Sequence, residues 1–357
     1  MRSCLIRFGS RSLPQGQFAP VSLSIATAVV VLAFGLALET GPVGAVAGQA
    51  VSHAIAALAE PMLGLSGLDL VRNGTELRSV SAGWAVRVSE VCDGMGLIVA
   101  LLATLLALAP GRGSATWVIR RAALGVAAVQ IFNLIRVVAL TLALDRWPGG
   151  FALLHDRLFP MLTVLVIGVV LLPATWLLAF AALTVGLALL WAPVAGTVSA
   201  LLVPIANALL PQGLVEMGEI ALRNGTWSVG TMFLAGTDPV RLFLAPLEPQ
   251  HFTLSMPVIA AAALLARRPL WLVFALPLML AALVVAAPVT VWALAAAEAP
   301  VTLLRSDGAG AFVPEAYAPP EVIRAILRLV QNTLVHFLLL VLPFLALSNA
   351  GGQRGRC

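Results

Sequence analysis

Three residues in the first half of the chain have the side-chain types that acyl transfer through a cysteine requires: Cys92, Arg136 and His155. In that chemistry a thiolate attacks a carbonyl carbon, a cation stabilises the developing charge, and an imidazole moves protons near neutral pH. Cys92 and His155 lie at the start of two apolar segments, and Arg136 lies toward the end of the segment between them. Successive membrane spans run in opposite directions, so all three would lie toward the same side. We therefore expect a nucleophile, a charge stabiliser and a general base to meet in one layer.

Cys92 stands at the start of an apolar segment, after Glu90 and before Asp93 and Gly94. A helix N-terminus favours the thiolate, whereas the adjacent carboxylate of Asp93 disfavours it. The arginine pattern described below would put Cys4 and Cys357 on the cytoplasmic side and Cys92 on the outer side, so we expect no disulfide partner for Cys92. The alternative interpretation is a small buried residue without a chemical role.

Arg136 lies inside the apolar segment 122–144, roughly 12 Å from its outer end at 1.5 Å per residue. An arginine there costs at least about 2.5 kcal/mol and implies a polar partner or a wet cavity, unless the side chain snorkels to the surface. Asn133 shares its helical face. His155, followed by Asp156, begins the next apolar segment, and a polar surface role is its alternative.

The composition is that of a polytopic membrane protein. Of the 357 residues, 61% are hydrophobic and 10% are charged, and the mean hydropathy is +1.02. An average soluble domain is about half apolar and about a quarter charged. This excludes a soluble globular protein, a disordered chain and a nucleic-acid-binding domain. The sequence contains no Gly-rich phosphate loop and no zinc-ligand spacing, so we expect no cofactor and no metal.

Eight segments are apolar enough to suggest membrane spans, which need about 20 residues each. Arginines gather before the first, between the second and third, between the sixth and seventh, and after the eighth. The positive-inside rule then puts both chain ends in the cytoplasm and the three candidate residues at the outer face of a bacterial inner membrane. The eight segments are 21–38, 93–110, 122–144, 158–174, 176–194, 251–266, 269–296 and 329–348.

The sequence also looks doubled. The run Val71-Arg72-Asn73-Gly74-Thr75 recurs as Leu222-Arg223-Asn224-Gly225-Thr226. Asn-Gly favours a hairpin turn, and residues 68–91 alternate enough for a short outer β-hairpin. Each copy follows an apolar stretch, at 46–63 and at 196–211, whose pattern predicts an amphipathic helix at the outer surface. We expect an all-α membrane fold of two parallel four-span repeats with outer surface helices and hairpins.

Only the first repeat carries the candidate residues. We therefore interpret residues 1–175 as a catalytic membrane domain and 176–357 as a degenerate, non-catalytic partner. The second half has no cysteine between its hairpin and the sixth apolar segment of the chain (251–266). The seventh segment (269–296) carries no charged residue. We read His336 as a helix–helix hydrogen-bonding residue and His53 as a water-facing one. The outer segment 297–325 would contact substrate or serve as a spacer.

Taken together, the motifs resemble the exosortase/archaeosortase family, in its short, exosortase H-like type. The resemblance covers residues 20–175 and rests on Cys-Asp-Gly at 92–94, Asn-x-x-Arg-Val at 133–137 and His155. It implies a cysteine transpeptidase that cleaves C-terminal sorting signals of secreted proteins and passes them to a surface acceptor. Cys92 would be the nucleophile, Arg136 the stabiliser of the oxyanion or thiolate, and His155 the general base and acid. The supporting residues would be Glu90, Asp93, Gly94, Asn133 and Asp156.

Two other function classes stay open on the sequence alone. Two four-span halves around a buried Arg136 would suit an anion transporter, although only one half carries polar spans. A non-enzymatic membrane assembly subunit would carry Cys92 incidentally. The expected partners are membrane lipid and, for the transpeptidase, secreted proteins with a short motif, an apolar span and a basic tail.

Overall fold

The computed structural model describes residues 21–39, 41–88, 93–111, 114–210, 215–223, 226–235, 241–247, 253–297, 301–306, 312–317 and 333–348, together with Ile326 and Leu329. Most of them are helical. The α-helices are α1 (Val21–Glu39), α2 (Pro42–Leu65), α3 (Met95–Leu108), α4 (Ala115–Arg146), α5 (Pro148–Ala152), α6 (Phe159–Leu171), α7 (Ala174–Ala208), α9 (Ser255–Ala266), α10 (Leu270–Ala297) and α12 (Leu342–Ser348). A 3₁₀ turn, η2 (Ala109–Gly111), follows α3, and two π-helical segments, η3 (Leu153–Leu158) and η4 (Phe337–Val341), precede α6 and α12.

Four described helices, α1, α2, α4 and α7, are long and apolar enough to cross a membrane. A fifth span results if Pro148–His155 and Phe159–Leu171, which meet at 42°, are taken together. The expectation of a mostly helical chain with several helices suited to spanning a membrane is therefore confirmed. The count of eight is not, because α3, α6 and α9 have only 12 to 14 residues, or about 18 to 21 Å of helix against a hydrocarbon core of about 30 Å.

Two antiparallel sheets accompany the helices. The first contains β1 (Leu70–Asn73), β2 (Glu76–Ser79) and β3 (Ala85–Arg87) in that order. The second has the order β4-β5-β7-β8, and β6 also pairs with β5. Its strands are β4 (Val215–Arg223), β5 (Thr226–Ala235), β6 (Arg241–Leu247), β7 (Val301–Ser306) and β8 (Phe312–Tyr317). The predicted hairpin within 68–91 is thus present and gains a third strand.

Both copies of the repeated Arg-Asn-Gly-Thr run lie at the tip of an antiparallel strand pair, but in different registers. In the first, Asn73 pairs with Glu76, so the connection is Gly74-Thr75. In the second, Arg223 pairs with Thr226 on either side of the Asn-Gly dipeptide. Gly74 has φ +63°, which a glycine adopts at no steric cost. The predicted Asn-Gly centre of the turn is therefore wrong for the first copy by one residue.

Two further expectations for the second half need correction. A separate surface helix over 196–211 is absent, because α7 continues without a break to Ala208. This helix contains no ionisable residue that would favour an end at 194, and Pro193 and Pro204 are accommodated inside it, as prolines are in apolar helices. The segment 297–325, expected to be an outer loop, contains β7 and β8, and β7 pairs with β5 at Phe233 and Leu303.

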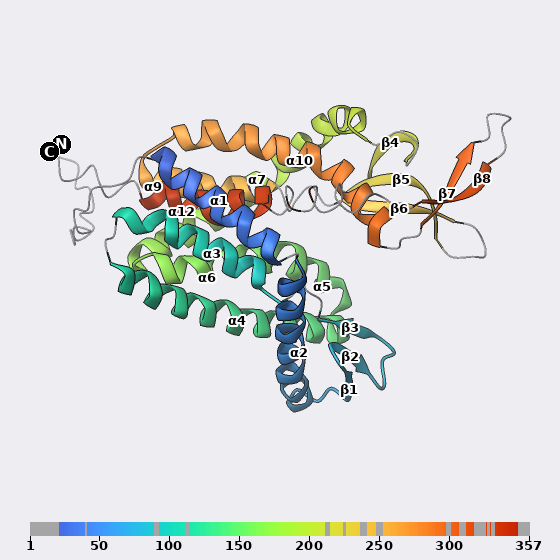
Figure 1. Cartoon of the computed structure of the whole chain (residues 1–357), viewed down its shortest axis with the longest axis horizontal. Coiled ribbons are helices and arrows are strands. Elements are labelled where there is room, and N and C mark those ends of the chain that lie inside the picture. The colour runs from blue at the N-terminus through green and yellow to red at the C-terminus, as the bar shows by residue number, and fades with distance from the viewer. Residues whose placement is uncertain are drawn as a thin grey trace.

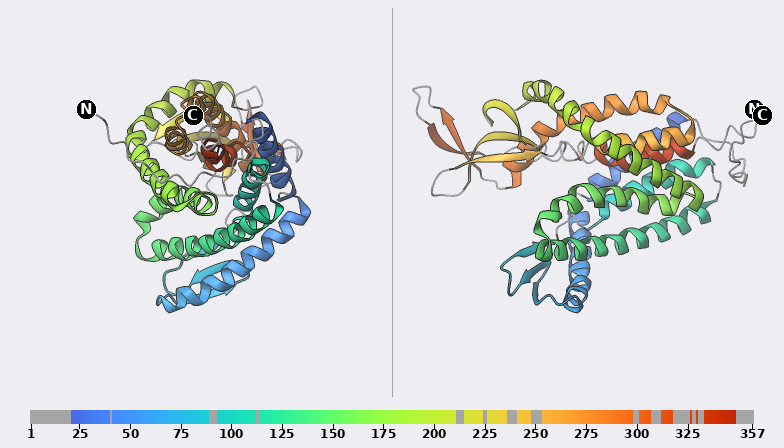
Figure 2. Two further views of the ribbon diagram at one scale, coloured as in Figure 1. Left: turned by 90° about the vertical axis from the view of Figure 1, so that its left-hand side faces the viewer. Right: turned by 180° about the vertical axis from the view of Figure 1, so that it is seen from behind.

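Both sheets lie at the same end of the helix bundle, whereas α3 ends and α10 begins at the opposite end (Figure 1). The helix α2 runs across the bundle direction, beside the first sheet, and the view from behind shows the same arrangement (Figures 1 and 2). Its buried residues, among them Ile55, Ala59 and Leu63, pack with Leu77 of β2 and Val137 of α4 in a small separate core. The predicted helix at 46–63 is confirmed as a distinct element.

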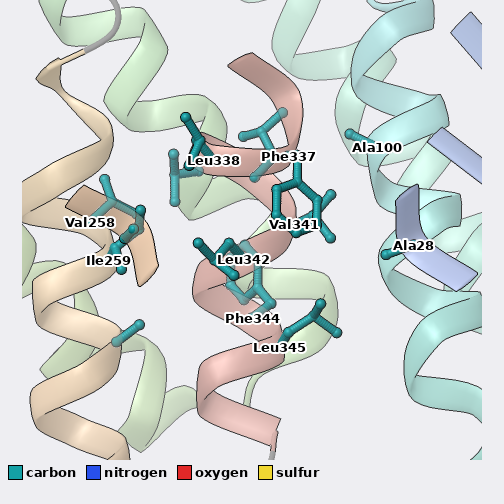
Figure 3. Close-up of a cluster of buried hydrophobic side chains, with 14 of the residues drawn as sticks. Ala28, Ala100, Val258, Ile259, Phe337, Leu338, Val341, Leu342, Phe344 and Leu345 are labelled. Carbon is teal, nitrogen blue, oxygen red and sulfur yellow. The ribbon is translucent and has the colours of Figure 1, made fainter. Parts of the chain in front are cut away.

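The main hydrophobic core joins the two halves of the sequence. Its central element is the segment 333–348, which lies between α9 on one side and α1 and α3 on the other (Figure 3). Phe337, Leu342 and Leu345 are buried there together with Ala28 and Ala100 of the first half. Small residues allow this close approach of helices.

Candidate active site

The candidate site begins at the turn that leads into α3. Gly94 caps the helix in a left-handed conformation, with φ +78°, and its carbonyl accepts the backbone N–H of Ile98 (3.1 Å). The carboxylate of Asp93 accepts the backbone N–H of Met95 (2.8 Å), and the Asp93 residue is buried. A carboxylate bonded to a free N–H at the positive end of a helix is partly neutralised. Asp93 therefore stabilises the start of α3, a role that the sequence interpretation did not assign to it.

This turn is pressed against α4. The side-chain amide of Gln130 donates to the carbonyl oxygen of Asp93 (3.1 Å). A Cβ placed on Gly94 would lie 3.3 Å from Nδ2 of Asn133 and 3.4 Å from Val129. Asn133 is itself only 1% exposed. The structure thus brings together three of the predicted supporting residues: Asp93 and Gly94 in the turn before α3, and Asn133 on α4.

Arg136 lies one helical turn beyond Asn133 on α4. Its Nε atom is buried and has no hydrogen-bond partner among the residues that the structure describes. The helix continues for about 15 Å to Arg146. There the indole Nε1 of Trp84 donates to Asp145 (3.1 Å), and Arg146 donates to the carbonyl oxygen of Ser66. Arg136 therefore lies nearer the middle of α4, whereas the first sheet and the end of α2 are bonded to the last turn of that helix.

His155 belongs to the π-helical segment η3, between α5 and α6. Its ring stacks on Phe151, with centroids 5.6 Å apart and planes inclined by 11°. Phe159, at the start of α6, meets Phe132 of α4 edge to face at 5.9 Å. Phe132 immediately precedes Asn133, so this aromatic contact fixes the start of α6 beside the Asn133 turn of α4. A π-helical turn inside a helical run is often found at functional sites.

Several predicted residues lie outside what is described. These are Glu90 and the expected nucleophile Cys92, and also the side chain of Asp156, whose backbone is part of η3. Their predicted roles stay predictions. In the described part of the chain no group of three or more His, Cys, Asp or Glu side chains could hold a metal ion.

Sequence reasoning missed two contributors to this region. Gln130 precedes Asn133 by three residues on the same face of α4, a spacing from which its contact with the α3 turn could have been inferred. Trp84, the partner of Asp145, lies in the connection between β2 and β3 and gave no such signal. His53 is exposed, as predicted, although a Cβ on Gly74 would approach its ring to 3.3 Å.

The comparisons with known proteins add no relative. No family model, no curated protein and no solved structure matches this chain. The chemistry of the site must therefore be argued from its own residues.

Proposed function

We propose that this chain is a membrane-embedded cysteine transpeptidase of the exosortase type. It would cleave the C-terminal sorting signal of secreted proteins at the outer face of the cytoplasmic membrane and transfer them to a surface acceptor. The observation that carries the proposal is the packing of the Asp93-Gly94 turn against Asn133, one helical turn from the buried Nε of Arg136. The residue that directly precedes this turn in the sequence is Cys92.

In the proposed reaction, the thiolate of Cys92 attacks the scissile carbonyl, and a thioester forms as the C–N bond breaks. Arg136 stabilises the negative oxygen of the tetrahedral intermediate. Protonated His155 donates its proton to the departing amine of the signal peptide. It recovers a proton from the acceptor amine, or from water, when that group attacks the thioester and releases the thiolate. Protons and electrons balance over the cycle.

The membrane arrangement is part of the same proposal. The eight spans would be α1, α3, α4, α6, the first part of α7, α9, α10 and the segment 333–348, with both chain ends in the cytoplasm. The helix α2 would lie in the outer interface, although its length and hydropathy would also allow a span. Its course across the bundle, its packing on the first sheet and exposed apolar residues such as Val46 (70%) and Leu65 (91%) support an interfacial position.

The test is processing of a substrate in cells. Secreted proteins that share a short C-terminal motif, an apolar span and an arginine-rich tail are sought in the genome that encodes this chain. One of them is co-expressed with the wild type, with Cys92→Ala, or with a Cys4→Ser/Cys357→Ser control. Loss of the tail with the wild type and the control, but not with Cys92→Ala, supports the proposal. Tail removal that continues at the normal rate with Cys92→Ala contradicts it.

A further inference from the structure

Among the described residues, the end of the helix bundle opposite the two sheets carries arginines and no acidic side chain. Helix α10 begins at this end, and α4 begins close to it because it follows the end of α3 (Figure 1). Arg120 and Arg121 lie in the second turn of α4, and Arg267 and Arg268 lie in the turn between α9 and α10. Because a guanidinium group keeps its charge at physiological pH, this end of the molecule is positive. All sixteen acidic residues of the sequence fall within 39–93, 145–156, 216–248 and 298–321.

These four arginines differ in their contacts. Arg121 donates to the carbonyl oxygen of Val170 near the C-terminal end of α6. Arg120 and Arg267 are exposed, and Arg268 is partly buried. Within the described part of the chain, none of these last three has a salt bridge or a side-chain hydrogen bond, and the salt bridges that are present all lie in the first sheet and α2. Three guanidinium groups are therefore open to an anion from outside the protein.

The turn after α9 fixes the backbone of two of them. The N–H of Arg267 donates to the carbonyl oxygen of Leu264 (3.1 Å), and the N–H of Arg268 donates to that of Ala263 (2.9 Å). Arg267 has φ +55°, and it is the one non-glycine residue with a positive φ in the described chain. Glycine is the usual residue at this position of a helix end, because a side chain is strained in the left-handed region. An arginine thus occupies a position where the backbone alone would favour glycine.

Exposed apolar side chains border these arginines. Ile119 directly precedes Arg120 and is 67% exposed, and Leu264 and Leu270 flank the other arginine pair and are 55% and 69% exposed. A surface of exposed apolar side chains bordered by guanidinium groups fits a phospholipid. The acyl chains contact the apolar part, and the phosphate accepts hydrogen bonds from the guanidinium groups. Free phosphate or a nucleic acid would match only the charged part.

We propose that Arg120, Arg267 and Arg268 bind the phosphate groups of anionic phospholipids. Arg121 is set apart because its guanidinium group is bonded to α6. Lipids with a net negative charge are favoured over zwitterionic ones, because no acidic side chain among the described residues at this end offsets the arginines. In the membrane arrangement proposed above, the lipids belong to the cytoplasmic leaflet. The proposal goes beyond the transpeptidase function and does not depend on it, since it concerns the end of α3 away from the Asp93-Gly94 turn.

The test measures lipid binding to the purified full-length protein in a neutral detergent. Native mass spectrometry follows the binding of phosphatidylglycerol and of phosphatidylcholine to the wild type and to Arg120→Gln/Arg267→Gln. The double variant should bind phosphatidylglycerol about 25-fold more weakly, since each arginine near an anionic headgroup contributes about fivefold, whereas binding of phosphatidylcholine should stay unchanged. The matched control, Arg78→Gln/Arg87→Gln, removes two arginines of the first sheet whose side chains are 69% and 73% exposed, and it should bind like the wild type.

Arg267→Gly separates lipid binding from folding. Glycine adopts φ +55° freely, so the unfolding temperature without lipid should not fall, whereas binding of phosphatidylglycerol should weaken about fivefold. Equal binding of this lipid by Arg120→Gln/Arg267→Gln and by the control would overturn the proposal. Displacement of the lipid by an equal concentration of inorganic phosphate would also overturn it. Neither result bears on the processing assay, in which failure of the proposed function appears as tail removal that ignores Cys92→Ala.

Discussion

The two sheets, which lie at the same end of the helix bundle, are alike in their hairpins but differ in how they are anchored (Figure 1). Leu77 and Trp227 occupy the same place, each in the second residue pair from its turn, opposite Arg72 and Leu222. Both are completely buried. Leu77 belongs to the small core that the first sheet shares with α2 and α4, whereas Trp227 belongs to the main core of the bundle.

We call the first sheet together with α2 the platform, because the two share a core that is separate from the main core of the bundle. The second sheet, in contrast, is part of the main core. The first sheet and α2 share a hydrophobic core of their own and meet the bundle mainly along α4, the helix that carries Asn133 and Arg136. The second sheet is continuous with the core that also buries the segment 333–348. A disturbance of the first sheet should therefore reach the candidate site mainly through α4, whereas a disturbance of the second should affect the whole bundle.

The largest effect is expected from Trp227→Ala. Removing a fully buried tryptophan destabilises by about 3–5 kcal/mol. Because Trp227 is part of the main core, thermal unfolding of the detergent-solubilised protein should shift as one transition. Trp147→Ala, at a tryptophan that is 56% exposed, is the control and should shift it little. Equal shifts for the two variants would show that the second sheet is not joined to the bundle.

Gly94→Ala should have the next largest effect and act on the site. The left-handed backbone at φ +78° is strained for alanine by about 1–3 kcal/mol, and the new methyl group would also press on Asn133. Substrate processing should fall with only a modest loss of stability. Gly83→Ala has φ +73° but open space around it, so it reproduces the backbone strain alone. Equal processing by both variants would show that the contact between Gly94 and Asn133 does not contribute to substrate processing.

Trp84→Phe tests the link between the first sheet and α4. It removes the indole N–H that Asp145 accepts and should cost about 1 kcal/mol in the free energy of unfolding. Asp145→Asn keeps a carbonyl acceptor and should cost less. The measurement is chemical unfolding of the two purified variants. A greater loss for Asp145→Asn than for Trp84→Phe would mean that this hydrogen bond does not hold the platform.

The smallest effect is expected where the platform meets water. Glu60 of α2 accepts from Nε of Arg72 of β1 at 2.8 Å, and both side chains are about one-third exposed. Ion pairs of this kind contribute about 0.2–1 kcal/mol, less in salt. Glu60→Gln should lower stability by an amount within that range and leave substrate processing unchanged. A loss of processing would show that α2 transmits more to the site than its packing suggests.

The local features of this fold could be predicted from the sequence, and the long-range ones could not. Composition indicated apolar helices, and the repeated Asn-Gly run indicated two hairpins. The one-residue register difference between the hairpins escaped prediction because the same turn sequence fits both registers. The end of α7 was missed because its residues are apolar on either side of Pro193. Glu39 and His336 both lie close to Gly96 although the three residues are far apart in the chain. No spacing pattern in the sequence predicts a contact of this kind.

The site shows the same division. Asn133 and Arg136 share a helical face through a three-residue spacing that is visible in the sequence, and Gln130 extends it. The cap that Asp93 provides for Met95 depends on the left-handed turn at Gly94, which the residue type permits but does not require. From the sequence, the charge of Asp93 predicts only an unfavourable effect on the Cys92 thiolate. The hydrogen bond from the Met95 N–H to the Asp93 carboxylate is visible only in the structure.

The most direct test of the central claim is the covalent intermediate on Cys92. The purified Cys4→Ser/Cys357→Ser protein is mixed with a substrate that carries the sorting signal, quenched in acid and analysed by intact-protein mass spectrometry. The account predicts an adduct with the mass of the substrate without its tail, located on Cys92, removed by hydroxylamine and absent from Cys92→Ala. Tail release that occurs without this adduct, or an adduct that forms equally on Cys92→Ala, would contradict it.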